Sequence, residues 1–300
     1  MGDMDQAGVF PALAITRWIQ FASVSIMFGA ALFWTCIDVP PRARAASARL
    51  LRIAALAAAV SGVLWLAEIL TNLTGSASTI FDPATLHLFF FETPFGAVAI
   101  LRLVLFAGAV LIAVLPWSNR VLFSLNLLIG ALLLISQAWL GHAAEGGATM
   151  ILVYCVHVLA AAAWVGSLPP LVFALTELRG LKSAGERTYE TLSRYSVMAM
   201  VAVGLVVISG AVNAGFRSGF SPARFLGTDY GLVLLVKAAG VSAMLGLACF
   251  NRFIVTPGLR VGSTGDAQAA RLRISVTLEL ALGVLVLAAA ALLGITPPPG

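Results

Sequence analysis

Charged residues are scarce in this sequence. Asp, Glu, Lys and Arg together make up only 10% of the 300 residues, whereas 60% are hydrophobic. So little polar surface cannot cover a water-soluble domain of this length. The composition therefore predicts an all-α membrane protein, a polytopic helical bundle held in a lipid bilayer.

Cysteine and catalytic motifs are scarce as well. Cys36, Cys155 and Cys249 lie in or at the ends of hydrophobic runs and show no CxxC spacing, which argues against a disulfide framework. The chain has no phosphate-binding loop, no HExxH motif and no activated Ser or Cys constellation, so we expect no enzyme activity. The net charge of +5 does not indicate nucleic-acid binding, because the basic residues are not gathered in one patch.

Hydrophobic runs of membrane-spanning length are abundant instead. A helix needs roughly 20 residues to cross a hydrocarbon core of about 30 Å. We expect eight transmembrane helices, at 13–36, 51–71, 95–115, 120–140, 150–175, 196–216, 230–252 and 273–294.

Basic residues are unevenly distributed between the expected loops. Most follow the first, third, fifth and seventh spans: Arg42, Arg44, Arg49, Arg52, Arg120, Arg179, Lys182, Arg187, Arg194, Arg252, Arg260, Arg271 and Arg273. The loops on the other side carry only Arg217 and Arg224. By the positive-inside rule the richer loops, including the charged loop at 177–195, are cytoplasmic, so both termini are periplasmic.

The third and seventh spans begin alike. Thr93 and Thr228 are each followed by an aromatic residue at two positions, glycine at three and a cation at nine. Those cations are Arg102 and Lys237. The match indicates a 4+4 parallel internal repeat within one membrane domain, with residues 1–141 as the first four-helix half and 142–300 as the second.

Other spans align in the same order. The first and fifth spans align on Gly29 and Gly166, which sets Gln20 opposite His157. The second and sixth align on Ser61-Gly62 and Ser209-Gly210. A shared order across all pairs supports a duplication.

The stretch 141–175 holds two of the three histidines. His157 falls inside a span, where an imidazole without a partner is costly and a functional role is the default expectation. On a helix it shares a face with Met150, Tyr154, Ala161 and Trp164. The simpler interpretation, a histidine that only hydrogen-bonds to a neighbouring helix, stays open.

All three histidines fall on the predicted periplasmic side. His87 lies in the loop before the third span and His142 at the end of the fourth. Imidazoles accept copper, zinc or haem iron, and thioethers favour Cu(I). We therefore treat His142, His157, His87 and Met150 as candidate metal ligands. Met150 is roughly 10 Å from His157 along the helix, so it would be a successive stop and not a co-ligand.

Several charged residues fall within or beside the spans. Arg102 and Lys237 are expected inside the membrane, where neither should face lipid without a partner. Glu68 and Asp229 are the anions available on that side, and we expect a structural ion pair for Arg102. The alternative is that such a cation binds an anionic ligand or the acidic groups of a cofactor.

Four further residues are candidates for an ion path or its support. Glu279 lies within the last span and could contact a proton or a cation, and Met27 is a sulfur in the middle of the first span. Trp164 and Tyr230 are supporting candidates. The remaining intramembrane sulfurs, Met244 among them, are assigned to core packing.

Five sequence pieces together resemble the copper resistance D (CopD) family of bacterial inner-membrane proteins. They are Gly141-His142-Ala143, the run from His157 to Trp164 and Gly166, Arg194-Tyr195-Ser196, Thr228-x-Tyr230-Gly231 with Lys237, and Asn251-Arg252. The resemblance covers most of the chain and is strongest from Gly141 onward.

This resemblance implies copper homeostasis, with copper ions moved across the inner membrane, by the usual proposal into the cytoplasm. It also implies a periplasmic copper-binding protein as a partner. The chain departs from some relatives because it lacks a fused periplasmic copper-binding domain and a Met- or His-rich outer loop.

Two other functions are compatible with the same residues. Two histidines on adjacent helices could be the axial ligands of one b-type haem in an electron-transfer protein, with Arg102 or Lys237 pairing with its propionates. Three histidines allow at most one such haem. The other alternative is a structural or assembly subunit whose histidines only pack.

Overall fold

Helices account for the whole regular structure in the described part of the chain. The computed structural model describes residues 3–37, 40–116, 118–140, 146–178, 184–218, 227–258 and 265–296. The long helices are α1 (Asp3–Cys36), α2 (Pro41–Thr74), α4 (Gly96–Val114), α5 (Asn119–Ser136), α6 (Gly147–Val165), α7 (Leu168–Glu177), α8 (Ala184–Ser218), α9 (Asp229–Phe250) and α11 (Gly265–Leu293). Short helical segments are η1 (Ala77–Phe81), α3 (Pro83–His87), η2 (Leu88–Glu92), η3 (Gln137–Trp139), η5 (Asn251–Val255) and α10 (Thr256–Gly258).

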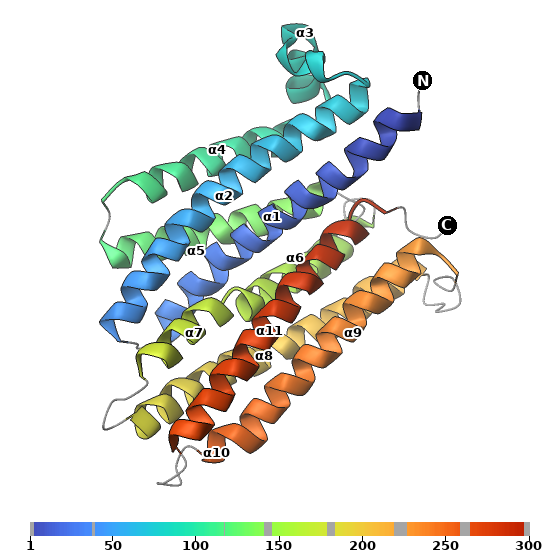
Figure 1. The fold of residues 1–300 in the computed structure, drawn as a ribbon. Helices are drawn as coiled ribbons and strands as arrows, with labels where there is room; N and C mark the ends of the chain where they lie inside the picture. Colours follow the sequence, from blue (N-terminus) through green and yellow to red (C-terminus); the bar gives the residue numbers. More distant parts are fainter. Residues whose placement is uncertain are drawn as a thin grey trace.

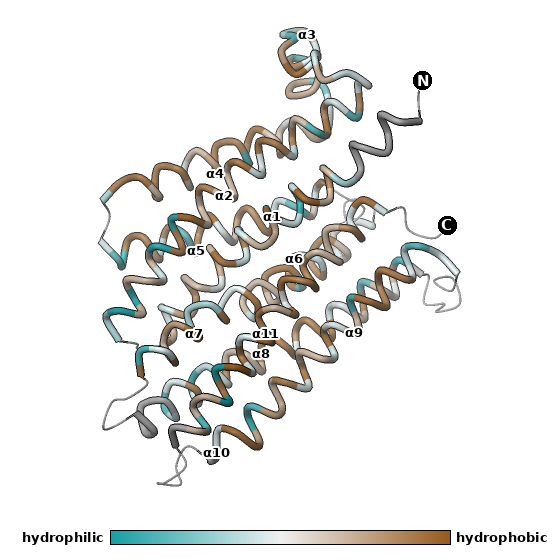
Figure 2. Tube along the Cα trace, viewed as in Figure 1, coloured by the Kyte–Doolittle hydropathy of each residue, from teal (hydrophilic) through white to brown (hydrophobic). Residues whose placement is uncertain are grey.

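Eight helical stretches in the described ranges are long and apolar enough to cross a membrane. They run over Pro11–Cys36, Pro41–Thr74, Gly96–Val114, Asn119–Trp139, Gly147–Glu177, Tyr189–Arg217, Asp229–Val255 and Ala267–Leu293. Hydrophobic residues extend along all of the long helices, as Figure 2 shows. The predicted all-α architecture with eight candidate spans is confirmed.

The fifth span consists of two helices. It is interrupted at Gly166 and Ser167, between α6 and α7. Pro169 and Pro170 follow at once, and because proline has no N–H, neither can donate to the preceding turn. Beyond this break α7 reaches Glu177, whose carboxylate accepts hydrogen bonds from backbone N–H groups at the start of α2. The α7 segment thereby satisfies the free donors of a helix in the other half of the chain.

The helices of residues 1–141, called the first half below, pack differently from those of residues 142–300, the second half. In the first half α1 packs along α2 and α5, and α4 packs along α2 and α5, which closes a four-helix arrangement. In the second half α6 packs along α8, and α11 along α9 and α7, but α8 and α9 do not pack along each other over their described lengths. Helix α1 joins the halves through α6 and α11. Both termini lie at the same end of the bundle, opposite α7 and α10 (Figure 1).

Helices α1 and α6 cross at a pair of glycines. A β-carbon on Gly29 would lie 2.7 Å from the Cα of Gly166, and one on Gly166 would meet the carbonyl of Ser25. Because only glycine leaves room for this approach, the two residues set the distance between the halves.

Candidate functional site

A cavity of about 180 Å³ lies in the second half of the bundle. Helices α6, α8, α9 and α11 surround it, and α1 and the end of α5 close it from the first half. Its polar lining consists of Arg17, Ser25, Gln137, Tyr154, His157, Asn213, Arg217, Tyr230 and Lys237, together with the indole of Trp164. Gly294 and Tyr230 belong to the helix ends near the termini, whereas Trp164 lies at the other end of α6 and Met244 lies well inside α9. The cavity therefore extends from the end with the termini toward the middle of the bundle.

His157 is held in the cavity wall by α8. Its Nδ1 lies 3.0 Å from the hydroxyl oxygen of Ser209. That hydroxyl donates its own hydrogen to the carbonyl of Leu205, one turn earlier in α8. The hydroxyl oxygen then accepts from Nδ1–H, and this tautomer leaves the lone pair on Nε2. An imidazole held through one nitrogen in this way presents the other to a ligand.

Most residues of the helix face predicted to carry His157 line the cavity. Tyr154, Ala161 and Trp164 line the cavity with His157. Met150 lies one turn beyond them and does not line it. This placement separates Met150 from the other residues of its predicted face.

Three cationic side chains line the cavity, and none of the Asp and Glu residues that the structure describes does. Arg17 comes from α1, Arg217 from the end of α8 and Lys237 from α9. The guanidinium of Arg217 stands 5.9 Å from the ring of Tyr230, which links α8 to α9 at the end near the termini. At the opposite end Arg252 of η5 donates to the hydroxyl of Ser196 on α8. Between these two contacts the cavity separates the helices.

A buried carboxyl group lies just below the cavity. The indole N–H of Trp164 donates to Glu279 Oε1 over 2.7 Å. Both side chains are buried, with 2% and 3% of their surface exposed. Met244, which is part of the cavity lining, is buried as well. Glu279 itself does not line the cavity, so Trp164 stands between the two.

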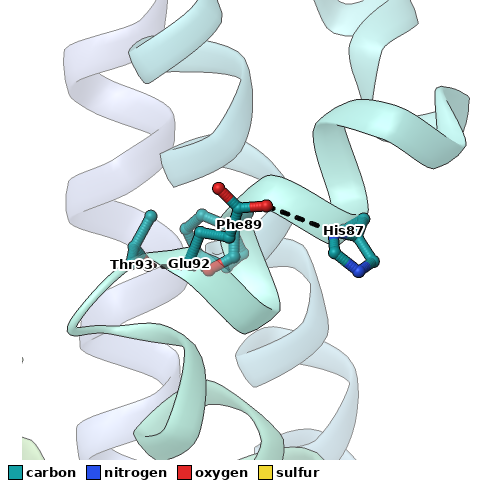
Figure 3. A network of polar contacts seen from close by, with 4 residues as sticks. All are labelled: His87, Phe89, Glu92 and Thr93. Carbon is teal, nitrogen blue, oxygen red and sulfur yellow. Dashed lines mark hydrogen bonds and ion pairs between the residues drawn. The ribbon is translucent and has the colours of Figure 1, made fainter.

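The other predicted histidines are not part of this cavity. His87 ends α3, and its ring contacts the carboxylate of Glu92 (Figure 3). The two atoms, Nδ1 and Oε1, lie 3.5 Å apart, and both side chains are largely exposed. The His87 ring packs 5.2 Å from that of Phe91. His142 lies outside the described residues. Of the three histidines, the described structure therefore places only His157 in the cavity.

Arg102 has other partners than the expected carboxylate. The side chain is completely buried, and it donates to the carbonyl of Leu133 over 2.9 Å and to the hydroxyl of Ser136 over 2.6 Å. Its guanidinium also stands over the rings of Trp65 and Phe106. The predicted ion pair is wrong for the described structure, because α5 supplies neutral acceptors at the depth of this cation.

Three more candidates lie away from the cavity. Glu68 accepts a hydrogen bond from the Thr16 hydroxyl over 2.7 Å. Asp229 is exposed at the start of α9. Met27 is fully buried in the first half, where it packs in an apolar cluster with alanines of α2. Met27 is therefore a packing residue in this structure.

Sequence reasoning missed several residues that line the cavity. Arg17 falls inside the predicted first span, and a cation at that depth is the signal that could have identified it. Met244 was assigned to core packing. Ser209 entered only through the repeat alignment, although a serine on a neighbouring helix is an ordinary partner for an intramembrane histidine.

No ready-made metal cage is present among the described residues. They contain no group of three or more His, Cys, Asp or Glu side chains placed to hold one ion. Among the described residues that line the cavity, the groups able to bind a soft metal are the imidazole of His157 and the thioether of Met244. Such a sparse set suits transient binding of a soft ion better than a structural site.

Comparison with known proteins identifies the family. Residues 4–150 match the N-terminal domain of copper resistance protein D-like proteins, and residues 189–293 match copper resistance protein D. The inner membrane protein YebZ of Escherichia coli K12 is 30% identical over 94% of this chain and 97% of its own length. Copper resistance protein D of Pseudomonas syringae pv. tomato is 34% identical over 69% of this chain and 70% of its own.

A longer relative is also similar. The copper transport protein CutJ of Bacillus subtilis is 28% identical over 96% of this chain, which corresponds to 53% of CutJ. No solved structure matches the chain. With eight spans and these relatives, the chain is a multi-pass inner-membrane protein, and it belongs to the copper resistance protein D family.

Proposed function

We propose that the protein moves copper ions across the inner membrane, from the periplasm to the cytoplasm, and that His157 receives the ion in the cavity. The observation that carries this proposal is the position of His157 in the cavity wall, with its Nδ1 3.0 Å from the Ser209 hydroxyl oxygen. Because that hydroxyl donates to the carbonyl of Leu205, we infer that Nδ1 carries the hydrogen and Nε2 the lone pair. An imidazole nitrogen with a thioether deeper in the same cavity suits Cu(I). The copper resistance and copper transport names of the relatives support the same substrate.

The proposed route begins at the end of the bundle that carries the termini. With periplasmic termini, as the positive-inside rule predicts, the cavity lies in the periplasmic half. His142, His87 and Met150 would receive copper at that surface, from a periplasmic copper-binding protein. Below the cavity, Trp164 and Glu279 would form the next part of the path.

Side-chain packing supports the proposed 4+4 repeat. Gly29 and Gly166, which the alignment pairs, contact each other between α1 and α6. His157 lies against Gly210, and Gln20 lies in a similar way against Gly62. Gln20 in the place of a histidine would leave the first half without an imidazole, so the proposed copper site belongs to the second half alone.

The haem alternative has no structural support. A bis-histidine haem needs a second imidazole facing the same cavity, and His157 is the only histidine that the described residues place there. The cavity has three cations that could meet propionates, but cations alone do not ligate haem iron.

Copper binding to the purified protein tests the proposal. We expect a colourless protein that binds Cu(I), with at least tenfold weaker binding in His157→Ala because this variant removes the imidazole that the described structure places in the cavity. Met200→Ala is the matched control and should keep at least half of the affinity, since the Met200 thioether is exposed on α8 and does not line the cavity. Metal analysis and an optical spectrum on detergent-purified protein measure both effects. A Soret band that disappears in His157→Ala would contradict copper as the ligand.

A further inference from the structure

We propose that the cavity binds an anionic group, a carboxylate or a phosphate, between Arg17, Arg217 and Lys237. The inference does not depend on copper, and it assigns the cavity a second ligand of opposite charge.

The first argument is the charge of the cavity wall. Over the described residues, each surrounding element contributes only neutral or cationic polar groups: Arg17 and Ser25 from α1, Gln137 from η3, Tyr154 and His157 from α6, Asn213 and Arg217 from α8, and Tyr230 and Lys237 from α9. Helix α11 contributes apolar residues and Gly294. The carboxylates of Glu68 and Asp229 belong to the same end of the bundle but do not line the cavity. An excess of like charge in a poorly solvated space favours an ion of opposite sign.

The second argument is the state of Arg17. Only 9% of this residue is exposed, and its guanidinium is stacked over the rings of Phe21 and Trp65 at 5.2 and 5.6 Å. The same group packs against Gly294, where a β-carbon would collide with it. Its Nε has no hydrogen-bond acceptor in the described part of the chain. A guanidinium that lines the cavity and is fixed by its packing is organised to receive a carboxylate or phosphate through its terminal N–H groups.

The third argument is the state of Lys237. No hydrogen bond or ion pair joins its ammonium group to another described residue. The aligned cation of the first half, Arg102, has a carbonyl and a hydroxyl of α5 as partners of one Nη, although its Nε and other Nη have no acceptor among the described residues. Lys237 faces the cavity instead because α8 and α9 do not pack along each other. A bound anion would give Lys237 the partner that a membrane cation requires.

The size and lining of the cavity restrict the ligand. A volume of about 180 Å³ admits a small anion or a headgroup. Leu234, Val286 and Leu287 complete the wall, so an apolar chain attached to the anionic group would also find contacts. A soluble carboxylate or phosphate from the water and an anionic phospholipid headgroup share this chemistry. A bound anion of either origin would also reduce the repulsion that three cations exert on an incoming metal cation.

The experiment measures anion binding to the full chain in neutral detergent and in phosphatidylcholine nanodiscs. Inorganic phosphate is titrated by calorimetry, and phosphatidylglycerol is compared with phosphatidylcholine by native mass spectrometry. The variants are Lys237→Met, which removes the charge at similar length, and Lys237→Arg, which keeps it. Arg120→Met is the matched control, because Arg120 is an exposed cation at the start of α5, away from the cavity.

We expect the wild type to bind phosphate or to prefer phosphatidylglycerol, with at least a tenfold loss in Lys237→Met and less than threefold in Lys237→Arg and Arg120→Met. Phosphate binding identifies the aqueous source, and a preference for phosphatidylglycerol identifies the lipid source. If Lys237→Met is not monodisperse, Arg217→Gln takes its place with the same expected loss. The proposal is overturned if the wild type prefers neither anionic probe, or if Arg120→Met loses as much binding as the cavity variants.

Discussion

A Gly166→Leu variant is expected to yield little folded protein. Any β-carbon at this position would meet the carbonyls of Ser25 and Ala162, so the α1–α6 crossing would have to open along its length. Inserting side-chain atoms into a packed contact typically costs about 1–3 kcal/mol, and a clash with backbone on both sides puts this variant at or above the upper end. Fluorescence-detected size-exclusion chromatography and the thermal midpoint measure the loss.

Gly246→Leu is the matched control for this variant. Gly246 also lies in a membrane-spanning helix, but a β-carbon there meets no atom within 4 Å. We therefore expect near wild-type yield. Equal loss in both variants would show that a leucine in any span is harmful and that the glycine crossing has no special role.

A Trp164→Phe variant is expected to lose about 2 kcal/mol of stability, the usual scale for a hydrogen bond to a charged or strongly polar buried group. Phenylalanine keeps most of the aromatic volume but removes the indole N–H. In the described part of the chain this N–H is the only hydrogen-bond donor to Glu279. Unfolding in mixed micelles, followed by circular dichroism, measures the change in free energy.

Two further variants isolate the cause. Trp18→Phe removes an indole that donates to the neutral carbonyl of Val284, so its cost should be smaller, about 1 kcal/mol. The double variant Trp164→Phe with Glu279→Leu should lose less than the sum of its single variants, because no carboxyl group remains without a donor. Strictly additive losses would contradict a direct interaction between the two side chains.

The eight spans were predictable because bilayer thickness fixes the length of an apolar helix, whatever its neighbours are. The face of α6 was predictable as well, since helical periodicity places Tyr154, His157 and Trp164 together. These properties belong to single helices. They do not depend on how one helix packs against another.

Contacts between helices could not be predicted in the same way. Arg102 was recognised as an intramembrane cation, but its partners depend on the register of α4 against α5. Lys237, which the repeat alignment pairs with Arg102, faces a cavity because α8 and α9 do not pack along each other. The sequence of neither helix predicts this separation. The guanidinium of Arg17 packs against Gly294, just past the end of α11. This contact could not be predicted because the two residues are far apart in the sequence.

The interruption between α6 and α7 shapes the electrostatic profile along the membrane normal. Helix α6 ends at Val165, inside the span Gly147–Glu177, so the negative end of its dipole lies where Trp164 and Val165 line the cavity. The start of α7 would normally cancel it with free N–H groups, but Pro169 and Pro170 have none to contribute. A cation on the copper route proposed above would therefore meet the negative end of the α6 dipole beside Trp164 after it leaves His157.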